Sequence, residues 1–207
     1  MLKLNYDKDN LTEAVNIINN GGVIIYPTDT LYGIGCNPFD SKAISKLIKI
    51  KKRNDKPLPV LCSDLDHVQN LVYLGKSGNK LASKFWPGGL TIIAKNINNN
   101  LPNELIGSTG GVGVRIPNHK GALKIISLCG GQLIATSANI SGSKPLESHE
   151  EIMRIFNNML DVLIYGNNKP SGIQSTVVDV ISGTTKIIRE GTISSKELKK
   201  TLEKEEK

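Results

Sequence analysis

Four cations lie within six residues at the end of a segment with helical periodicity. They are Lys51, Lys52, Arg53 and Lys56, and Pro57 follows them directly. Such a group suits a polyphosphate, because arginine binds two oxygens at once and lysine acts as a point charge. One or two of these cations would equally complement the C-terminus of a helix. A polyphosphate site also accounts for the stiff, proline-containing segment that follows.

Two short segments supply hydroxyl and amide side chains after apolar runs. Residues 26–35 read YPTDTLYGIG and include Thr30, and residues 136–142 read TSANISG and include Ser137 and Asn139. Loops at strand ends are where α/β proteins bind ligands, and small polar side chains can bond phosphate there. Each segment could equally be a turn whose side chains bond the local backbone.

Three further segments place polar residues or glycines at predicted strands. Gly111 opens GVGVRIP, in which Arg115 stands shortly before a proline. Ser175 lies in QSTVVD, and Arg189 lies in IIREG. Taken singly, each of these segments is more often structural than catalytic.

The sequence lacks the motifs of several common catalytic classes. It contains no GxxxxGK[ST] phosphate loop, no strand-linked GxGxxG fingerprint and no GxSxG nucleophile elbow. Of the histidines, only His119 lies within three residues of the polar segments. The remaining inventory is cations, hydroxyls, an amide and backbone groups. It favours electrostatic positioning of a nucleotide over covalent or general-base catalysis.

Hydrophobic periodicity predicts the elements that must position these residues. Helices are expected at residues 10–20, 40–51, 64–73, 77–86, 120–128, 148–156 and 194–206. Strands are expected at residues 22–27, 57–62, 90–95, 112–116, 132–136, 161–165, 176–181 and 185–189. The irregular alternation predicts an α/β fold with a twisted sheet of mixed parallel and antiparallel strands, flanked by helices.

Composition narrows the class of protein. The 207 residues suit a single domain, with its core expected at about residues 8–191. No apolar run is long enough for a membrane span, and no cysteine or histidine spacing suggests a metal site. Cys36, Cys62 and Cys129 are odd in number and far apart, which predicts reduced thiols and a cytoplasmic protein. The formal charge of +7 permits an anionic partner such as a nucleotide or RNA.

Taken together, these segments resemble those of the YrdC/Sua5/TsaC family of threonylcarbamoyl-AMP synthases. PTDTLYGIG, KKR followed by KPL, WPGGLTII, GVGVRIP, TSANISG, STVVD and IIREG occur in the family's order and spacing across residues 22–191. The Lys-x-Arg and Ser-x-Asn pairs that mark the family are matched by Lys51, Arg53, Ser137 and Asn139. Sua5 proteins usually carry an additional C-terminal domain, so the chain is similar to the short, single-domain type. It has Lys56 and Leu61 where many relatives have an asparagine and a histidine.

The resemblance implies a YrdC/RibB-like fold with a large, basic, concave groove. It also implies synthesis of threonylcarbamoyl-AMP and pyrophosphate from L-threonine, bicarbonate and ATP, with Mg²⁺ held mainly by the phosphates. The product would pass to the tRNA threonylcarbamoyl transferase complex to make N6-threonylcarbamoyladenosine, and tRNA itself is a possible partner. By resemblance, catalysis is assigned to Lys51, Arg53, Ser137 and Asn139, ATP binding to Arg53, Lys56, Gly111, Ser137 and Arg189, and threonine binding to Thr30, Arg115, Ala135 and Ser175.

Two other functions remain open. A double-stranded RNA- or ribosome-binding module would use the basic groove without catalysis, but it has no need of fixed hydroxyl and amide side chains. A carbamoyl-transferring domain of the hydrogenase-maturation type normally lies in a much longer chain with zinc-finger-like segments, which are absent from this sequence. The synthase is therefore the function that we expect.

Overall fold

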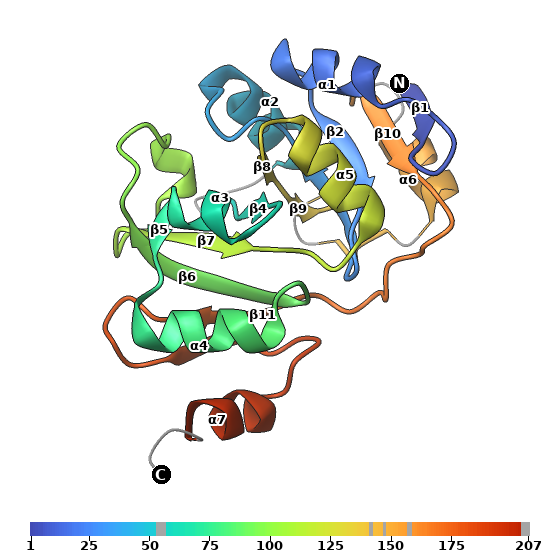
Figure 1. Cartoon of the computed structure of the whole chain (residues 1–207). Coiled ribbons are helices and arrows are strands. Elements are labelled where there is room, and N and C mark those ends of the chain that lie inside the picture. The colour runs from blue at the N-terminus through green and yellow to red at the C-terminus, as the bar shows by residue number, and fades with distance from the viewer. Residues whose placement is uncertain (53–56, 141–142, 147, 157–158, 204–207) are drawn as a thin grey trace.

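The computed structural model describes residues 1–52, 57–140, 143–146, 148–156 and 159–203 (Figure 1). The strands form two sheets, each of mixed direction. The prediction of a mixed α/β fold is therefore confirmed, although the strands divide between two sheets instead of forming one.

Sheet A has five strands in the order β1-β10-β2-β3-β9. Parallel pairing joins β1 to β10 and β10 to β2, and antiparallel pairing joins β2 to β3 and β3 to β9. The strands are β1 (Leu2–Asn5), β10 (Val162–Tyr165), β2 (Ile24–Pro27), β3 (Tyr32–Gly35) and β9 (Thr136–Ser137).

Sheet B has seven strands, six of them in the order β12-β11-β6-β7-β4-β8, with β5 added on β6. The pairs β11–β6 and β4–β7 are parallel, and the other pairs are antiparallel. The strands are β12 (Lys186–Arg189), β11 (Thr176–Asp179), β6 (Leu90–Asn96), β7 (Gly111–Arg115), β4 (Val60–Cys62), β8 (Gln132–Ile134) and β5 (Val72–Tyr73).

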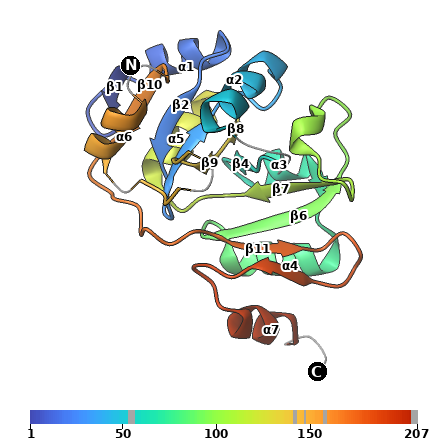
Figure 2. The same ribbon diagram turned by 180° about the vertical axis from the view of Figure 1, so that it is seen from behind.

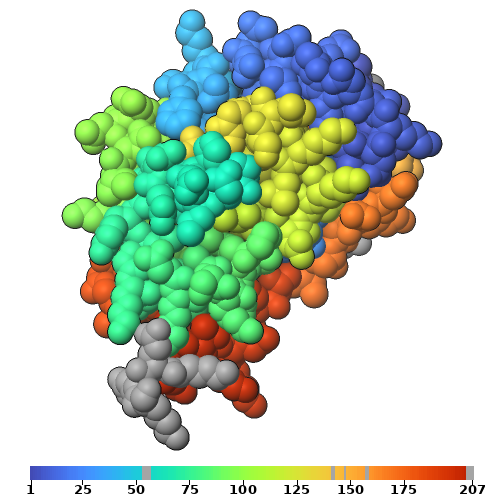
Figure 3. Space-filling model, viewed as in Figure 1, coloured from blue at the N-terminus to red at the C-terminus, as the bar shows by residue number. Residues whose placement is uncertain are grey.

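The helices cover both sheets. In Figure 1, α4 lies against sheet B with α7 beyond it, and Figure 2 shows the same stacking from behind. Helix α5 contacts β2 of sheet A as well as β4 and β8 of sheet B, and Figure 3 shows it as a yellow band at the surface. The helices are α1 (Thr12–Asn19), α2 (Ser41–Lys51), α3 (Leu65–Gln69), α4 (Gly75–Phe85), α5 (Lys120–Leu128), α6 (His149–Phe156) and α7 (Ser195–Glu203), with a 3₁₀ turn at Asn103–Leu105.

The centre of sheet A is buried on both faces, because β2 and β10 are apolar at successive positions. In β2, Ile24 belongs to the cluster that contains the buried residues of α1 and α5. Its neighbour Ile25 belongs to the larger cluster that contains those of α2 and α6. This alternation is the two-residue period of a strand placed between two layers of helices.

The chain passes from sheet B to sheet A at Ala135, between β8 and β9. The two sheets approach closely there, because a Cβ atom at Gly35 would lie only 1.8 Å from the carbonyl oxygen of Ile134. That oxygen also accepts the buried hydroxyl of Tyr26 at 2.9 Å. Only glycine fits at position 35, so the glycine-rich YGIG sequence serves the junction of the sheets.

Most of the predicted elements are present with shifted ends, and α5 matches residues 120–128. The prediction for residues 64–73 is wrong in its second half, since α3 ends at Gln69 and Val72–Tyr73 form β5. The strand predicted at residues 132–136 divides at Ala135, and neither β1 nor β3 was predicted. The last residues of the predicted tail helix, 204–206, lie outside the described part of the chain.

No helix in the described residues has both the length and the apolar character that a membrane span requires. The predicted absence of disulfides agrees with the structure, in which Cys36, Cys62 and Cys129 are all free.

His119 is the N-cap of α5 and is only 4% exposed. Its Nδ1 accepts the backbone N–H of Ala122 at 3.1 Å, so this nitrogen carries no proton. Its Nε2 then donates to the carbonyl oxygen of Asn168 at 3.2 Å, and the ring is neutral. Burial lowers the pKa of His119 from its ordinary value, because a charge on this ring would be desolvated.

We expect acid to destabilise the fold through His119. Because its folded-state pKa lies below the unfolded value, its contribution to the free energy of unfolding is complete above the unfolded pKa. That contribution is lost as the pH falls through the folded pKa. His119→Asn keeps a capping oxygen that does not titrate. In thermal melts between about pH 7.5 and about pH 5, part of the wild-type decrease in Tm should be missing from the variant. Parallel decreases in the two proteins would contradict this assignment.

Candidate functional site

A cavity of about 720 Å³ lies between the two sheets. One side is formed by residues of β6, β7, β11 and β12 in sheet B that face the cavity. The opposite side is formed by the β2–β3 turn and β9 of sheet A. Its volume falls in the range of pockets that enclose a small organic ligand. Seven of the predicted site residues line it: Thr30, Gly111, Arg115, Ala135, Ser137, Ser175 and Arg189.

Alternate residues of β7 form the floor of the cavity, namely Gly111, Gly113 and Arg115. A Cβ atom at Gly111 would lie 2.3 Å from the Cδ1 of Ile181 and 2.8 Å from the Cγ2 of Ile93, so a side chain there would displace these two isoleucines. At Gly113 a Cβ atom would meet Thr91 and Pro59 only at ordinary distances of 3.5 and 3.6 Å. The missing side chain at Gly113 therefore leaves open space, and Arg115 alone extends from this face of the strand.

Arg115 is 4% exposed and its guanidinium is fixed at all three nitrogens. Nε donates to the carbonyl oxygen of Gly88 at 2.8 Å, and Nη1 donates to the Oγ1 of Thr30 at 2.8 Å. Nη2 donates to the carboxylate of Asp29 at 2.5 Å in a largely buried ion pair. Burial lowers the pKa of Arg115, and the charge of Asp29 opposes this effect. The prediction did not include Asp29 as a partner of this arginine.

A second polar cluster joins β6, β11 and β12. The hydroxyls of Thr91 and Ser175 are 2.9 Å apart, and the Nη2 of Arg189 donates to the Ser175 carbonyl oxygen at 2.8 Å and its hydroxyl at 3.1 Å. Partial burial lowers the pKa of the Arg189 guanidinium, and the positive charge of Arg115 lowers it further. Two neighbouring arginines with lowered pKa values form a site that an anion would stabilise.

Lys51 ends α2 and is 1% exposed. Its ammonium donates to the carbonyl oxygen of Ser137 and, at 3.1 Å, to the Oδ1 of Asn139. The Ser137 hydroxyl donates to the same Oδ1 at 2.6 Å, and the Asn139 amide donates to the carbonyl oxygen of Ser143 at 2.6 Å. Helix α2 thus holds the polar loop after β9 through one buried ammonium group. The structure brings Lys51, Ser137 and Asn139 together, as their assignment to one site requires.

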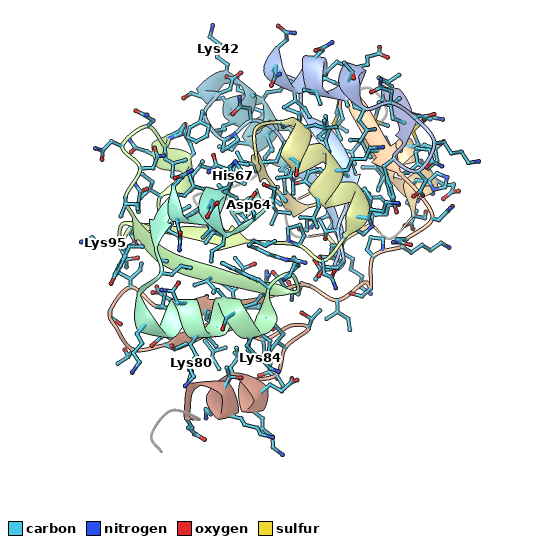
Figure 4. The ribbon with its side chains drawn as sticks, in the orientation of Figure 1. Lys42, Asp64, His67, Lys80, Lys84 and Lys95 are labelled. Atoms are coloured by element: carbon cyan, nitrogen blue, oxygen red, sulfur yellow. The ribbon has the colours of Figure 1, made fainter. Side chains whose placement is uncertain are left out.

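Two predicted site residues, Arg53 and Lys56, lie outside the described residues. Their roles stay predictions, and so does the overall basic character of the groove. Leu61 lines the cavity. Exposed lysines are spread elsewhere, and in Figure 4 Lys42, Lys84 and Lys95 project from the outer surface.

Sequence reasoning missed three residues at or beside the cavity: Asp29, Thr91 and Asp179. Strand alternation is the signal that could have found two of them. Thr91 pairs in register with Val177, and Ile93 pairs with Asp179, so both polar residues share the cavity face. No sequence signal shows that Asp29 bonds a residue 86 positions away.

The described residues offer little covalent or metal chemistry. They contain no group of three or more His, Cys, Asp or Glu side chains that could hold a metal ion. Burial raises the pKa of Cys36 and Cys129 to about 12 and also raises that of Cys62, so these thiols stay protonated at neutral pH.

The contact between Asp64 and His67, both labelled in Figure 4, is structural. Asp64 accepts the backbone N–H of His67 as the N-cap of α3, and its carboxylate lies 2.7 Å from the imidazole.

Comparison with known proteins supports the sequence resemblance. The family model Sua5_yciO_yrdC, described as "Telomere recombination", matches residues 16–191. A curated threonylcarbamoyl-AMP synthase from Pyrococcus abyssi is 30% identical over 191 residues, which cover 91% of this chain and 56% of that protein.

Two solved structures are similar along nearly the whole chain. P. abyssi Sua5, crystallised with L-threonine, has a TM-score of 0.89 at 28% identity. The matched region covers 98% of this chain and 60% of the Sua5 chain. E. coli YciO has a TM-score of 0.85 at 26% identity. The matched region covers 95% of this chain and 98% of the YciO chain. The chain thus spans little more than half of the P. abyssi proteins.

We expect Lys51→Met to loosen the loop after β9 while the fold persists. Methionine preserves the buried stem but removes the donor to Ser137 and Asn139, at an expected loss of about 1–3 kcal/mol in the free energy of unfolding. Amide hydrogen exchange at residues 137–139 should accelerate. Lys46→Met is the matched control, because Lys46 lies on the same helix and forms a half-exposed ion pair with Asp161. If both variants leave exchange in this loop unchanged, Lys51 does not hold it.

Proposed function

Because the chain belongs to the Sua5/YciO/YrdC family, we propose that it is an L-threonylcarbamoyladenylate synthase. In this proposal it forms threonylcarbamoyl-AMP and pyrophosphate from L-threonine, bicarbonate and ATP, and residues 1–207 act as a single YrdC-like domain. The observation that carries the proposal is the cavity between the sheets, where two arginines lie beside three hydroxyl side chains. The threonine complex of the similar P. abyssi protein supports the choice of amino acid.

The proposed chemistry has two steps. The amine of threonine first forms a bond to the carbon of bicarbonate, water leaves, and an N-carboxylate (carbamate) results. A carbamate oxygen then attacks the α-phosphorus of ATP, and the bond to pyrophosphate breaks. Both reactants are anions, so their approach is opposed by charge repulsion. Fixed cations in a partly dry cavity lower this barrier and need no protein nucleophile.

We propose the following division of the cavity. Arg115 binds the threonine carboxylate, while Thr30, Ser175 and the backbone at Ala135 surround the amino acid. Arg189, Ser137 and the backbone at Gly111 bind the nucleotide, together with Arg53 and Lys56. Lys51 and Asn139 support catalysis through the loop of Ser137, an assignment favoured by the buried ammonium and its two acceptors.

Magnesium would enter with ATP in this proposal. The described residues provide no carboxylate cage, and Asp179 is the acidic residue in the described wall of the cavity. These residues fit an ion that is held mainly by phosphate oxygens and water, which is the usual manner of Mg²⁺ binding. The ion would neutralise charge on the triphosphate.

We also propose that the product serves tRNA. Threonylcarbamoyl-AMP would pass to the tRNA threonylcarbamoyl transferase complex, which makes N6-threonylcarbamoyladenosine, and the site of action would be the cytoplasm. Direct tRNA binding is part of the same proposal and is supported by the net charge of +7.

A direct assay tests the activity. The protein is incubated with ATP, Mg²⁺, labelled bicarbonate and L-threonine, and both pyrophosphate and the labelled adenylate are measured. Both products should require all of the substrates. Arg189→Ala should reduce the rate by roughly 10²–10³-fold, which is the scale for loss of one preorganised donor. Double-stranded RNA binding without any pyrophosphate release would instead support a non-catalytic module.

We expect threonine to be used well and valine poorly. The hydroxyls of Thr30 and Ser175 lie at the cavity, and beside the arginine that each already contacts, each oxygen can accept one more hydrogen bond from a substrate hydroxyl. A site that bonds a hydroxyl rejects an analogue without one, because its own polar groups are left unpaired. Pyrophosphate release should therefore have a kcat/KM at least about 100-fold lower with valine. Equal values for the two amino acids would show that no such recognition exists.

A further inference from the structure

Asp29 occupies the turn between β2 and β3 and contacts three separate parts of the chain. Its Oδ1 accepts from the Nη2 of Arg115 at 2.5 Å and from the backbone N–H of Asn118 at 3.1 Å. Its carbonyl oxygen accepts the N–H of Ser171 at 3.2 Å. The described wall of the cavity includes Arg115 but not Asp29. The carboxylate therefore does not line the cavity itself, and it reaches the cavity wall through its bond to the guanidinium of Arg115.

The contacts of Arg115 determine how it can bind a ligand. The bonds to Gly88, Thr30 and Asp29 use three of the five N–H groups of the guanidinium, one on each nitrogen. One N–H then remains on each terminal nitrogen. Two such N–H groups bind both oxygens of one carboxylate when they point in the same direction. Without Asp29, the Nη2 of Arg115 would lose its acceptor. The side chain could then rotate about the single bonds before the guanidinium.

We propose that Asp29 is a positioning residue for the carboxylate of threonine, because it holds Arg115 in the one orientation that presents its remaining N–H groups as a pair. The identity of the ligand in this inference rests on the proposed function. The geometric part, that Asp29 orients Arg115, does not.

Two substitutions at Asp29 separate orientation from stability. Asp29→Ala removes the acceptor, and it should raise the KM for threonine at least about 10-fold while the KM for ATP changes less than about twofold. Asp29→Asn keeps an oxygen for Arg115 and Asn118, so it should restore most of the threonine affinity. A purely structural role would lower Tm and either change both KM values together or change neither.

Asp161→Ala is the matched control. Asp161 also accepts one backbone N–H, from Val23, and one basic side chain, from Lys46, but it lies outside the described wall of the cavity. It should lower Tm by a similar amount and leave the KM for threonine unchanged. Equal KM changes in Asp29→Ala and Asp161→Ala would overturn the proposal, as would a threonine KM in Asp29→Ala within about twofold of the wild type.

A measurement without turnover keeps this test independent of the activity. In ¹⁵N spectra, the Nε–H signal of Arg115 is identified by its absence from Arg115→Lys. Its exchange with solvent should accelerate at least about 10-fold in Asp29→Ala and change little in Asp29→Asn. If the wild type releases no pyrophosphate but this exchange responds as expected, the proposed function fails and the positioning role stands. Unchanged exchange in Asp29→Ala overturns the positioning role, whatever the activity.

Discussion

The site depends on one buried positive charge that both sheets must satisfy. Arg115 comes from sheet B, but two of its three partners, Asp29 and Thr30, belong to the β2–β3 turn of sheet A. A buried guanidinium without partners would strongly destabilise the fold. The relative position of the sheets is thus tied to the hydrogen bonding of one side chain. The same requirement places the hydroxyl of Thr30 beside the guanidinium and so assembles one end of the cavity.

The fold was predictable where hydrophobic periodicity alone determines an element, and less so where the packing of the two sheets also determines it. Helix α5 has a clean apolar face and was predicted to the residue. Strand β3 was missed because its glycines suggest a turn, whereas they permit the contact of Gly35 with the carbonyl group of Ile134. The prediction also missed that the strand at residues 132–136 breaks at Ala135. Local sequence gives no sign that a continuous apolar run changes sheets.

For the candidate site, the residue types were predictable and the contacts between them were not. Family motifs indicated the residue types that line the cavity, and strand alternation explains why Gly111, Gly113 and Arg115 share a face. The contacts between segments were not predictable, because they depend on how the two sheets pack. Asp29 with Arg115 and Lys51 with Ser137 are examples, since 86 residues separate the partners in each pair. Such pairs become visible only when the tertiary structure is known.

The two glycines of β7 give the cavity unequal capacities to change during evolution. A side chain at position 111 would have to displace Ile181 and Ile93, so a substitution there disturbs the packing of the strand. Position 113 has room for a methyl group without displacing its neighbours. Gly113→Ala would therefore reduce the volume of the cavity at its floor while the sheet stays intact. Two glycines of one strand, two residues apart, thus differ in whether they can accept a side chain.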